Sequence, residues 1–346
     1  MQSSRTRGIA AALLAAVTFG LTVPVAKAWF GGINPWLLAG LLYLGSGLGL
    51  ATWAATQRRA WSVPRNQLPW LAGAVLAGGI LAPVLLLVGL RGVPASTAAL
   101  LLTCEGLFTS LLAWVVFREH YDRRIVIGFI AIAGGAVTLA MAPGSPQSAA
   151  LVPTLLVLAA CLGWGIDNNL TREISLADPL QIAAAKGLVA GLTNTVLALG
   201  MGAQLPPLKV VALAGTVGFL GYGLSLVLFV YALRELGTSR TSAYFSVAPF
   251  VGAILAVLVL GEPFTVALVL AGALMGWGVW LHVTERHLHD HDHEAIEHEH
   301  AHVHDEHHDH RHDDGAPQGP HAHRHTHTPL RHQHPHFPDA HHRRDH

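Results

Sequence analysis

Three charged residues lie inside long apolar stretches of the 346-residue chain: Glu105, Asp167 and Lys186. A charge at the centre of a bilayer costs about 2.5–3.5 kcal/mol, so such residues tend to be retained for a role. Asp167 and Lys186 lie at similar depth on consecutive antiparallel segments, so their side chains can form an ion pair. That pair either fixes helix packing or lines a solute or proton pathway, and both interpretations stay open.

Glu105 stands near the middle of its apolar segment. It follows Pro94 by eleven residues, which is about 16 Å along a helix. It has no basic partner at its own depth, and a carboxyl group buried without a cation holds its proton more tightly. We therefore favour a proton-coupling role for Glu105, the alternative being a hydrogen bond to a polar group on an adjacent helix.

Three amides accompany these charges. Asn168 and Asn169 follow Asp167 directly, and Asn194 lies in the same apolar segment as Lys186. Amides at such depth bond a neighbouring helix or bind a solute. The candidate solute or ion pathway therefore consists of Glu105, Asp167, Asn168, Asn169, Lys186 and Asn194.

A second group of chemically active residues fills the C-terminal tail, 285–346. All histidines except His120 and His282 lie there, among Asp and Glu. Imidazole with carboxylate suits zinc, nickel, cobalt or copper ions. The alternation predicts diffuse binding of several ions, at His287, His289, His291, His293, His298, His300, His302 and His304. The alternative is a solvated tail whose metal affinity is incidental. We expect that the protein requires no cofactor.

The composition indicates which elements position these residues. The chain is 52% hydrophobic and 12% charged, whereas soluble domains carry about 25% charged residues. A bilayer-spanning helix needs about 20 apolar residues. Ten segments qualify: 8–29, 35–56, 68–90, 94–117, 124–141, 151–171, 180–201, 209–234, 238–260 and 264–284. We expect an all-α integral membrane protein of ten transmembrane helices, with a disordered tail.

The first segment also resembles a signal peptide, because Arg5 and Arg7 precede it and Ala26-Lys27-Ala28 resembles a cleavage site. Its apolar run is longer than a usual signal core, so we interpret it as a span. Lys and Arg in the short loops favour a cytoplasmic N-terminus. That orientation gives three basic residues outside and eleven inside, namely Arg5, Arg7, Arg58, Arg59, Arg65, Arg118, Arg123, Arg124, Arg172, Arg234 and Arg240. We expect both termini to be cytoplasmic, in the inner or plasma membrane.

The chain contains an internal repeat. Phe19-Gly20 with Lys27 matches Trp164-Gly165 with Arg172 at an offset of 145 residues. Ser96 and Glu119 match Ser239 and Glu262 at an offset of 143. The repeat predicts five helices in residues 8–141 and five in 151–284, followed by the tail. Five is odd, so the halves are inverted relative to each other, a transporter design with a binding site near the midplane.

These motifs resemble the EamA branch of the drug/metabolite transporter superfamily. The resemblance covers about residues 8–284 and includes Ala248-Pro249 and Leu260-Gly261-Glu262-Pro263. The chain departs from the family pattern at Glu105-Gly106, where Glu-Pro is common, and at Phe117-Arg118-Glu119, where Leu-Gly-Glu is common. The resemblance implies ten helices and secondary transport of small organic solutes, without fixing the substrate.

We therefore expect a secondary transporter that exports a small organic metabolite, with the lipid bilayer, a small-molecule solute and divalent metal ions at the tail as partners. No nucleophile–base or nucleotide-binding motif occurs, so we expect neither an enzyme nor a nucleic-acid partner. The alternatives are a Zn/Ni/Co exporter that uses Cys104, Glu105 or Asp167, and a metal-sensing membrane protein. No span carries paired His and Asp at helical spacing, as a metal pathway should.

Overall fold

The computed structural model describes residues 2–57, 63–117, 123–141, 147–174, 177–236, 241 and 244–284. It also describes four short segments of the tail, 290–293, 297–302, 321–326 and 330–333. The chain divides into two compact units, Met1–Glu285 and Arg286–His346.

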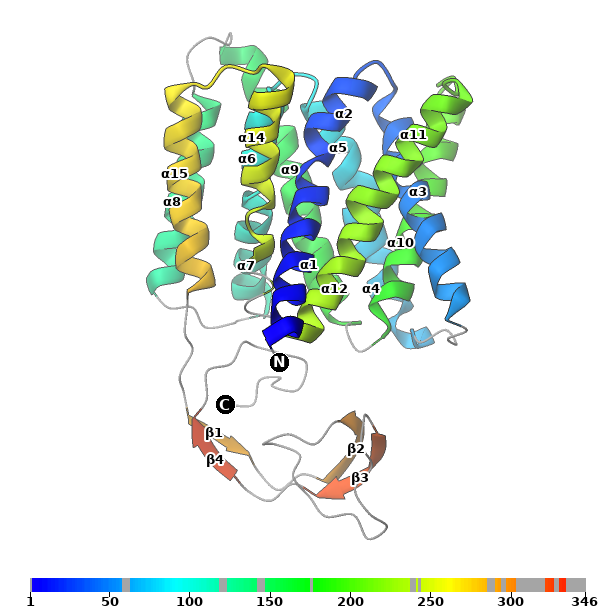
Figure 1. Ribbon diagram of the computed structural model, residues 1–346, viewed down its shortest axis with the longest axis vertical. Coiled ribbons are helices and arrows are strands. Elements are labelled where there is room, and N and C mark those ends of the chain that lie inside the picture. The colour runs from blue at the N-terminus through cyan, green and yellow to red at the C-terminus, as the bar shows by residue number, and fades with distance from the viewer. Residues whose placement is uncertain are drawn as a thin grey trace. The chain divides into compact units, whose positions relative to one another are not determined.

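Helices form the first unit, and the first of them begins at the end of the bundle where the last one ends (Figure 1). We call this the N-terminal end and the opposite one the far end. The elements are α1 Gln2–Gly20, α2 Thr22–Phe30, α3 Pro35–Thr56, η1 Arg65–Gln67, α4 Leu68–Ala74, η2 Val75–Leu81, α5 Ala82–Gly89, α6 Ala95–Leu101, α7 Cys104–Phe117, α8 Arg123–Ala140, α9 Gln147–Arg172, α10 Pro179–Gly200, α11 Leu208–Gly218, η3 Phe219–Leu224, α12 Ser225–Leu236, α14 Ala248–Leu260 and α15 Val266–Val283.

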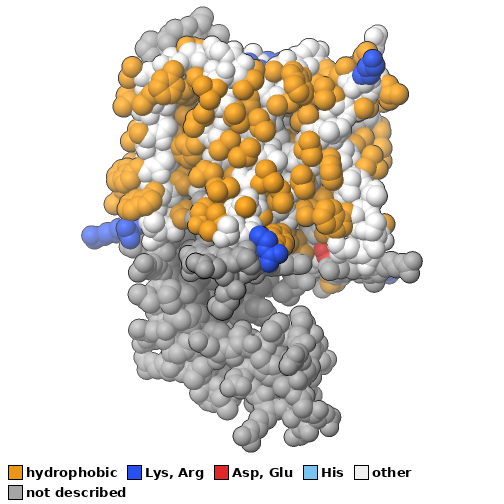
Figure 2. All heavy atoms as spheres, viewed as in Figure 1, with side chains coloured by type: hydrophobic (Ala, Val, Ile, Leu, Met, Phe, Trp, Pro, Cys, Tyr) orange, Lys and Arg blue, Asp and Glu red, His pale blue; other side chains and the backbone are white. Residues whose placement is uncertain are grey.

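The membrane-spanning prediction agrees with the structure. Among the described residues, nine helical stretches are long and apolar enough to cross a membrane. At the position of the remaining predicted span, 238–260, the described helix is the shorter α14. Hydrophobic side chains cover the side of this unit in Figure 2, and Lys and Arg lie toward its two ends. The first unit is therefore an all-α membrane bundle, as the sequence predicts.

Local sequence explains where two central helices begin. The Asn34 carboxamide accepts a hydrogen bond of 2.9 Å from the Trp36 backbone N–H, and Pro35 opens α3. Asp178 caps the Leu180 N–H at 2.9 Å, and Pro179 opens α10. A polar cap followed by proline satisfies a free N–H and fixes the first helical φ. The two caps are 144 residues apart, as the internal repeat predicts.

Two π-helical segments, η2 and η3, interrupt the third span of each half. Their first residues, Val75 and Phe219, are again 144 positions apart. A π-helical turn widens the helix by one residue and changes which carbonyl groups are paired. Both halves therefore carry the same backbone irregularity at the same place.

Helices of one half pack mainly against helices of the other half. The most extensive contacts include α3 with α10, α8 with α15 and α1 with α12, all of which join residues 8–141 to residues 151–284. Gly47 of α3 faces Gly187 of α10 so closely that a Cβ on either would overlap the other backbone. Small residues allow helices in membranes to approach this closely. The halves thus form one interleaved bundle.

The second unit contains four short strands among its described residues: β1 Asp290–His293, β2 Glu297–His302, β3 His321–Thr326 and β4 Leu330–Gln333. Strand β1 pairs with β4 and β2 with β3, both antiparallel. The alternation of His with other residues in these segments has the two-residue period of a strand.

Candidate functional site

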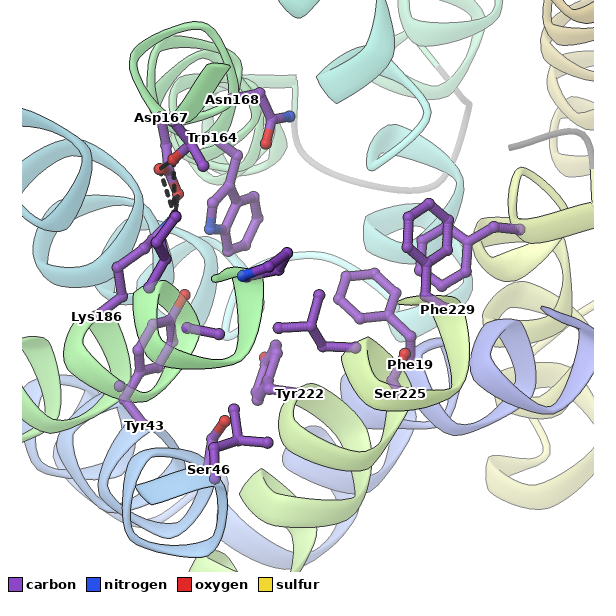
Figure 3. Close-up of a pocket in the computed structure, with 18 of the residues that line it drawn as sticks. Phe19, Tyr43, Ser46, Trp164, Asp167, Asn168, Lys186, Tyr222, Ser225 and Phe229 are labelled. Atoms are coloured by element: carbon purple, nitrogen blue, oxygen red, sulfur yellow. Dashed lines mark hydrogen bonds and ion pairs between the residues drawn. The ribbon is translucent and has the colours of Figure 1, made fainter. Parts of the chain in front are cut away.

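A cavity of about 450 Å³ lies between helices of both halves. It reaches the last turn of α9 at Thr171 and the first turn of α10 at Pro179, so it extends toward the N-terminal end. Side chains from α1, α3, α9, α10, η3 and α12 surround it in Figure 3. Four of the six predicted pathway residues line it, namely Glu105, Asp167, Asn168 and Lys186.

Asp167 and Lys186 form the ion pair that their depth makes possible (Figure 3). The Lys186 ammonium lies 2.5 Å from Oδ1 and 2.7 Å from Oδ2 of Asp167. The Thr171 hydroxyl donates to Oδ1 of the same carboxylate at 2.9 Å. The Asp167 side chain is 7% exposed and that of Lys186 18%, so both charges are largely withdrawn from solvent and depend on each other.

The π-helical segment η2 supports this pair. Gly78 lies directly against the Asp167 carboxylate, where any side chain would overlap it. The Gly78 carbonyl accepts hydrogen bonds of 2.9 Å from the Tyr43 hydroxyl and from the Trp164 indole N–H. Three helices therefore meet at one glycine. Its carbonyl is available to side chains because the π turn directs the Ala82 N–H to Ala77 and Pro83 has no N–H.

Glu105 lies in the first turn of α7, after a short break in the helix at Leu102 and Thr103. Its Oε1 accepts a hydrogen bond of 3.0 Å from the Asn168 amide, which also donates to the Thr109 hydroxyl at 3.2 Å. In the described part of the chain, Glu105 thus contacts an amide on an adjacent helix rather than a cation. This is the contact named as the alternative to a proton role, and it leaves that role untested.

The other two predicted residues do not line the cavity. The Asn169 amide donates to the carbonyls of Thr109 at 3.0 Å and Gly165 at 2.8 Å, joining α9 to α7. The Asn194 amide donates to the Gly79 carbonyl at 3.2 Å, and the residue is fully buried against η2. Both amides therefore hold neighbouring helices together. The sequence indicates the depth of these residues in the membrane, but not the direction in which their side chains point.

An aromatic wall completes the cavity, and the sequence analysis did not include it. Phe19 and Tyr222 meet edge to face at 6.0 Å between ring centroids, and Tyr43 lies 5.5 Å from Tyr222. Phe245 lies 5.6 Å from Phe19 and 5.0 Å from Phe229. The available signal was the repeat, since it aligns Phe19 with Trp164, and both residues line the cavity.

Polar contacts tie the two halves together at the far end. The Glu262 carboxylate accepts hydrogen bonds from the Ala95 and Ser96 N–H groups at 2.7 and 2.8 Å, and from the Ser96 hydroxyl at 2.6 Å. Within the first half, Lys27 donates to the Val93 carbonyl at the same end. A carboxylate at the start of a helix satisfies free N–H groups and complements the helix dipole. A separate hollow of about 360 Å³ at this end shares no lining residue with the main cavity.

No group of three or more His, Cys, Asp or Glu side chains that could hold a metal ion occurs among the described residues. Cys104 and Cys161 are buried, and Cys161 contacts the Leu101 carbonyl at 3.4 Å. Of the predicted tail ligands, His287, His289 and His304 lie outside the described residues. The others lie in strands, where only the backbone is described: His291, His293, His298, His300 and His302.

The sequence matches a known family model over most of its length. The model of the EamA-like transporter family matches residues 6–141 and again residues 152–284. The chain is also similar to a solved crystal structure at 18% identity and a TM-score of 0.56, which covers 82% of this chain and 96% of that one. At that identity the likeness concerns the fold alone.

Two curated relatives extend the comparison. A protein of Methanothermobacter thermautotrophicus named "uncharacterized transporter" is 29% identical over 80% of this chain and 86% of its own length. A protein of Salmonella typhimurium named "probable amino-acid metabolite efflux pump" is 27% identical over 76% of this chain and 90% of its own length. Transport is thus the activity in the names of both relatives.

Proposed function

Because this chain belongs to the EamA-like transporter family, we propose that it is a secondary transporter that exports a small organic metabolite. The observation that carries the proposal is the cavity between the two halves, with an ion pair and a carboxyl group on its wall. Its volume of about 450 Å³ lies within the 300–1,000 Å³ common for small-molecule sites. A cavity at the interface of inverted repeats is also where secondary transporters bind their solutes.

The proposal includes an orientation, with the N-terminal end in the cytoplasm of an inner or plasma membrane. The bias of Lys and Arg in the loops supports it. The cavity then receives solute from the cytoplasm, as export requires, while the contacts of Glu262 and Lys27 hold the far end. Reporter enzymes inserted after Ser62 and Gly144 are expected on opposite sides of the membrane. Reporters on the same side would overturn the inverted repeat, and a Ser62 reporter outside with a Gly144 reporter in the cytoplasm would overturn the orientation.

A deletion strain tests export. The strain is loaded with labelled metabolites, and efflux is compared after complementation with the full chain, with Glu105→Gln, and with a chain that ends at Thr284. The full and shortened chains are expected to restore efflux of the same metabolite, because the cavity lies within Met1–Glu285. If complementation restored only metal resistance, the metal exporter would replace the metabolite exporter.

We further propose that the tail binds divalent transition metals. Its composition supports this, and so does the register of β2 and β3, which places His298, His300 and His302 opposite His325, His323 and His321. In competition with a chromophoric chelator, full-length protein is expected to take up several Zn²⁺ or Ni²⁺ ions per chain. The chain ending at Thr284 is expected to take up none, and equal uptake by both would refute the role of the tail.

A further inference from the structure

Most hydrogen-bond donors on the cavity wall are already paired within the protein. Lys186 binds both oxygens of Asp167. The Tyr43 hydroxyl and the Trp164 indole N–H donate to the Gly78 carbonyl. A solute that needs donors would therefore have to break contacts that the protein makes with itself.

The smaller polar groups follow the same pattern. The Ser225 hydroxyl donates to the Ala15 carbonyl at 2.9 Å, and the Thr171 hydroxyl donates to Asp167. The Asn168 amide has two N–H groups, and they donate to Glu105 and Thr109. Among the described lining residues, the Tyr222 hydroxyl pairs with the Thr22 side chain, and the Ser46 hydroxyl remains, which can also accept a hydrogen bond.

In contrast, two hydrogen-bond acceptors on the cavity wall have no donor among the described residues. Asn168 occupies only Oε1 of Glu105, and within the described residues no protein donor reaches Oε2. The same holds for the Asn168 carbonyl oxygen, which lies beside that carboxylate. The charged groups point the same way, because Asp167 and Lys186 neutralise each other and Glu105 adds a carboxyl group, which an ammonium beside it would hold in the charged form. This part of the cavity thus offers acceptors and a carboxyl group that no cation of the described residues occupies.

The aromatic wall suits the same kind of solute. Phe19, Tyr43 and Tyr222 form a continuous surface with ring centroids 5.5–6.0 Å apart. Aromatic faces attract cations as well as apolar groups. A carboxylate in this place would meet Glu105 without a free cation to balance it, because Lys186 is held by both oxygens of Asp167.

We propose that the transported solute is a primary or secondary amine that carries an apolar body and no carboxylate. Its ammonium group binds Oε2 of Glu105 and the Asn168 carbonyl, and its body lies on the aromatic wall. The inference rests on the proposed transport function and narrows its substrate class. It gives Glu105 a role in recognition, which is to select solutes by charge.

Two sets of matched compounds test the proposal, with full-length protein in detergent and in proteoliposomes at pH 7.5. The aromatic set is tyramine, tyrosine and 3-(4-hydroxyphenyl)propionate, and the aliphatic set is isoamylamine, leucine and 4-methylpentanoate. Within each set the body is shared and only the charged groups differ. Binding is measured by calorimetry, and transport is measured as flux above that of protein-free liposomes. At least one amine is expected to bind about tenfold or more tightly than the two compounds that share its body.

Variants connect this preference to Glu105. Glu105→Gln keeps the size of the side chain and is expected to weaken amine binding about tenfold or more, whereas Glu105→Asp retains part of it. Glu262→Gln serves as the control, because it removes a carboxylate that lies outside the cavity lining. It is expected to leave the order of the three compounds in each set unchanged.

The amine assignment is wrong if neither amine binds, if a zwitterion or carboxylate binds as tightly as its amine, or if Glu105→Gln leaves amine binding unchanged. These outcomes are distinct from failure of the transport function. Protein-dependent flux of a zwitterion or carboxylate would overturn the assignment and leave transport intact. If no component of a ¹⁴C-labelled cell extract crossed the proteoliposome membrane, the transport function itself would fall.

Discussion

Glu262 and Ser96 are joined by two hydrogen bonds, 2.8 Å to the Ser96 backbone N–H and 2.6 Å to its hydroxyl. The two residues belong to different halves of the chain, and each is part of the sequence repeat that pairs Ser96 and Glu119 with Ser239 and Glu262. The Ser of one repeat thus binds the Glu of the other, as the contact between Ser96 and Glu262 shows. The other two residues of the motif, Glu119 and Ser239, lie outside the described residues. The carboxylate that follows α14 caps the helix that begins at Ala95.

We predict that Glu262→Gln destabilises the bundle. The amide loses the charge and presents an N–H₂ group to backbone donors, so the free energy of unfolding is expected to fall by about 1.5–3 kcal/mol. Thermal unfolding in detergent measures the change. Lys209→Gln is the control, because Lys209 is exposed and its loss also changes a far-end charge by one. Equal melting temperatures for the two variants would show that the cap contributes nothing.

A second prediction concerns Gly78. In Gly78→Ala the added methyl group overlaps the Asp167 carboxylate, so the ion pair with Lys186 has to move. Transport is expected to fall by about tenfold or more, since small displacements at a binding site are costly. Gly106→Ala is the matched control, because a Cβ at this helical glycine meets nothing within 4 Å. Normal flux in Gly78→Ala vesicles would contradict the proposed arrangement.

The Asp167–Lys186 pair can be assigned to packing or to transport with a double variant. Asp167→Asn alone leaves the Lys186 charge unpaired and is expected to destabilise the protein by about 3–5 kcal/mol. The combination of Asp167→Asn with Lys186→Met removes both charges and is expected to recover most of that loss. We predict that the double variant folds but does not transport, because the pair lines the cavity. Full transport by the double variant would assign the pair to packing alone.

The tail is predicted to respond to pH. It carries 6 basic and 13 acidic residues, a formal charge of −7 with neutral histidine. Histidine titrates near pH 6.5, so half-protonation of its 22 histidines adds 11 positive charges and reverses the sign. Acidification is therefore expected to drive the tail onto anionic lipid.

Co-sedimentation with phosphatidylserine vesicles measures this response, with a fusion of residues 285–346 to a soluble carrier protein. Binding is expected to rise between pH 7.5 and 5.5 and to be absent for the carrier alone. Binding that stays constant over this range would refute the prediction.

Hydropathy and charge made much of the fold predictable, because each span needs a minimum number of apolar residues. The same reasoning placed Asp167 and Lys186 at one depth, where the structure pairs them. Depth along a helix can be counted from the sequence, whereas the direction of a side chain depends on packing with neighbouring helices. This explains why Asn169 and Asn194, at suitable depth, point into helix contacts instead of the cavity.

The π-helical segments show the other limit of the sequence. Val75–Leu81 has no residue type that requires a π turn, yet this turn directs the Ala82 N–H to Ala77, and Pro83 has no N–H, so the Gly78 carbonyl is available to Tyr43 and Trp164. The aromatic wall was missed for a related reason, since Phe, Tyr and Trp are also common on lipid-facing surfaces. Only the rotation of each helix distinguishes the cavity side from the lipid side.

The interleaving of the halves has a consequence for biosynthesis. The principal partners of α3 and α8 are α10 and α15, which leave the ribosome much later. The early spans must therefore remain in the lipid without their final neighbours. The close contact of Gly47 with Gly187, for example, cannot form until α10 has been made. The bundle therefore assembles late in synthesis. The two halves, expressed as separate polypeptides in one cell, are expected to associate.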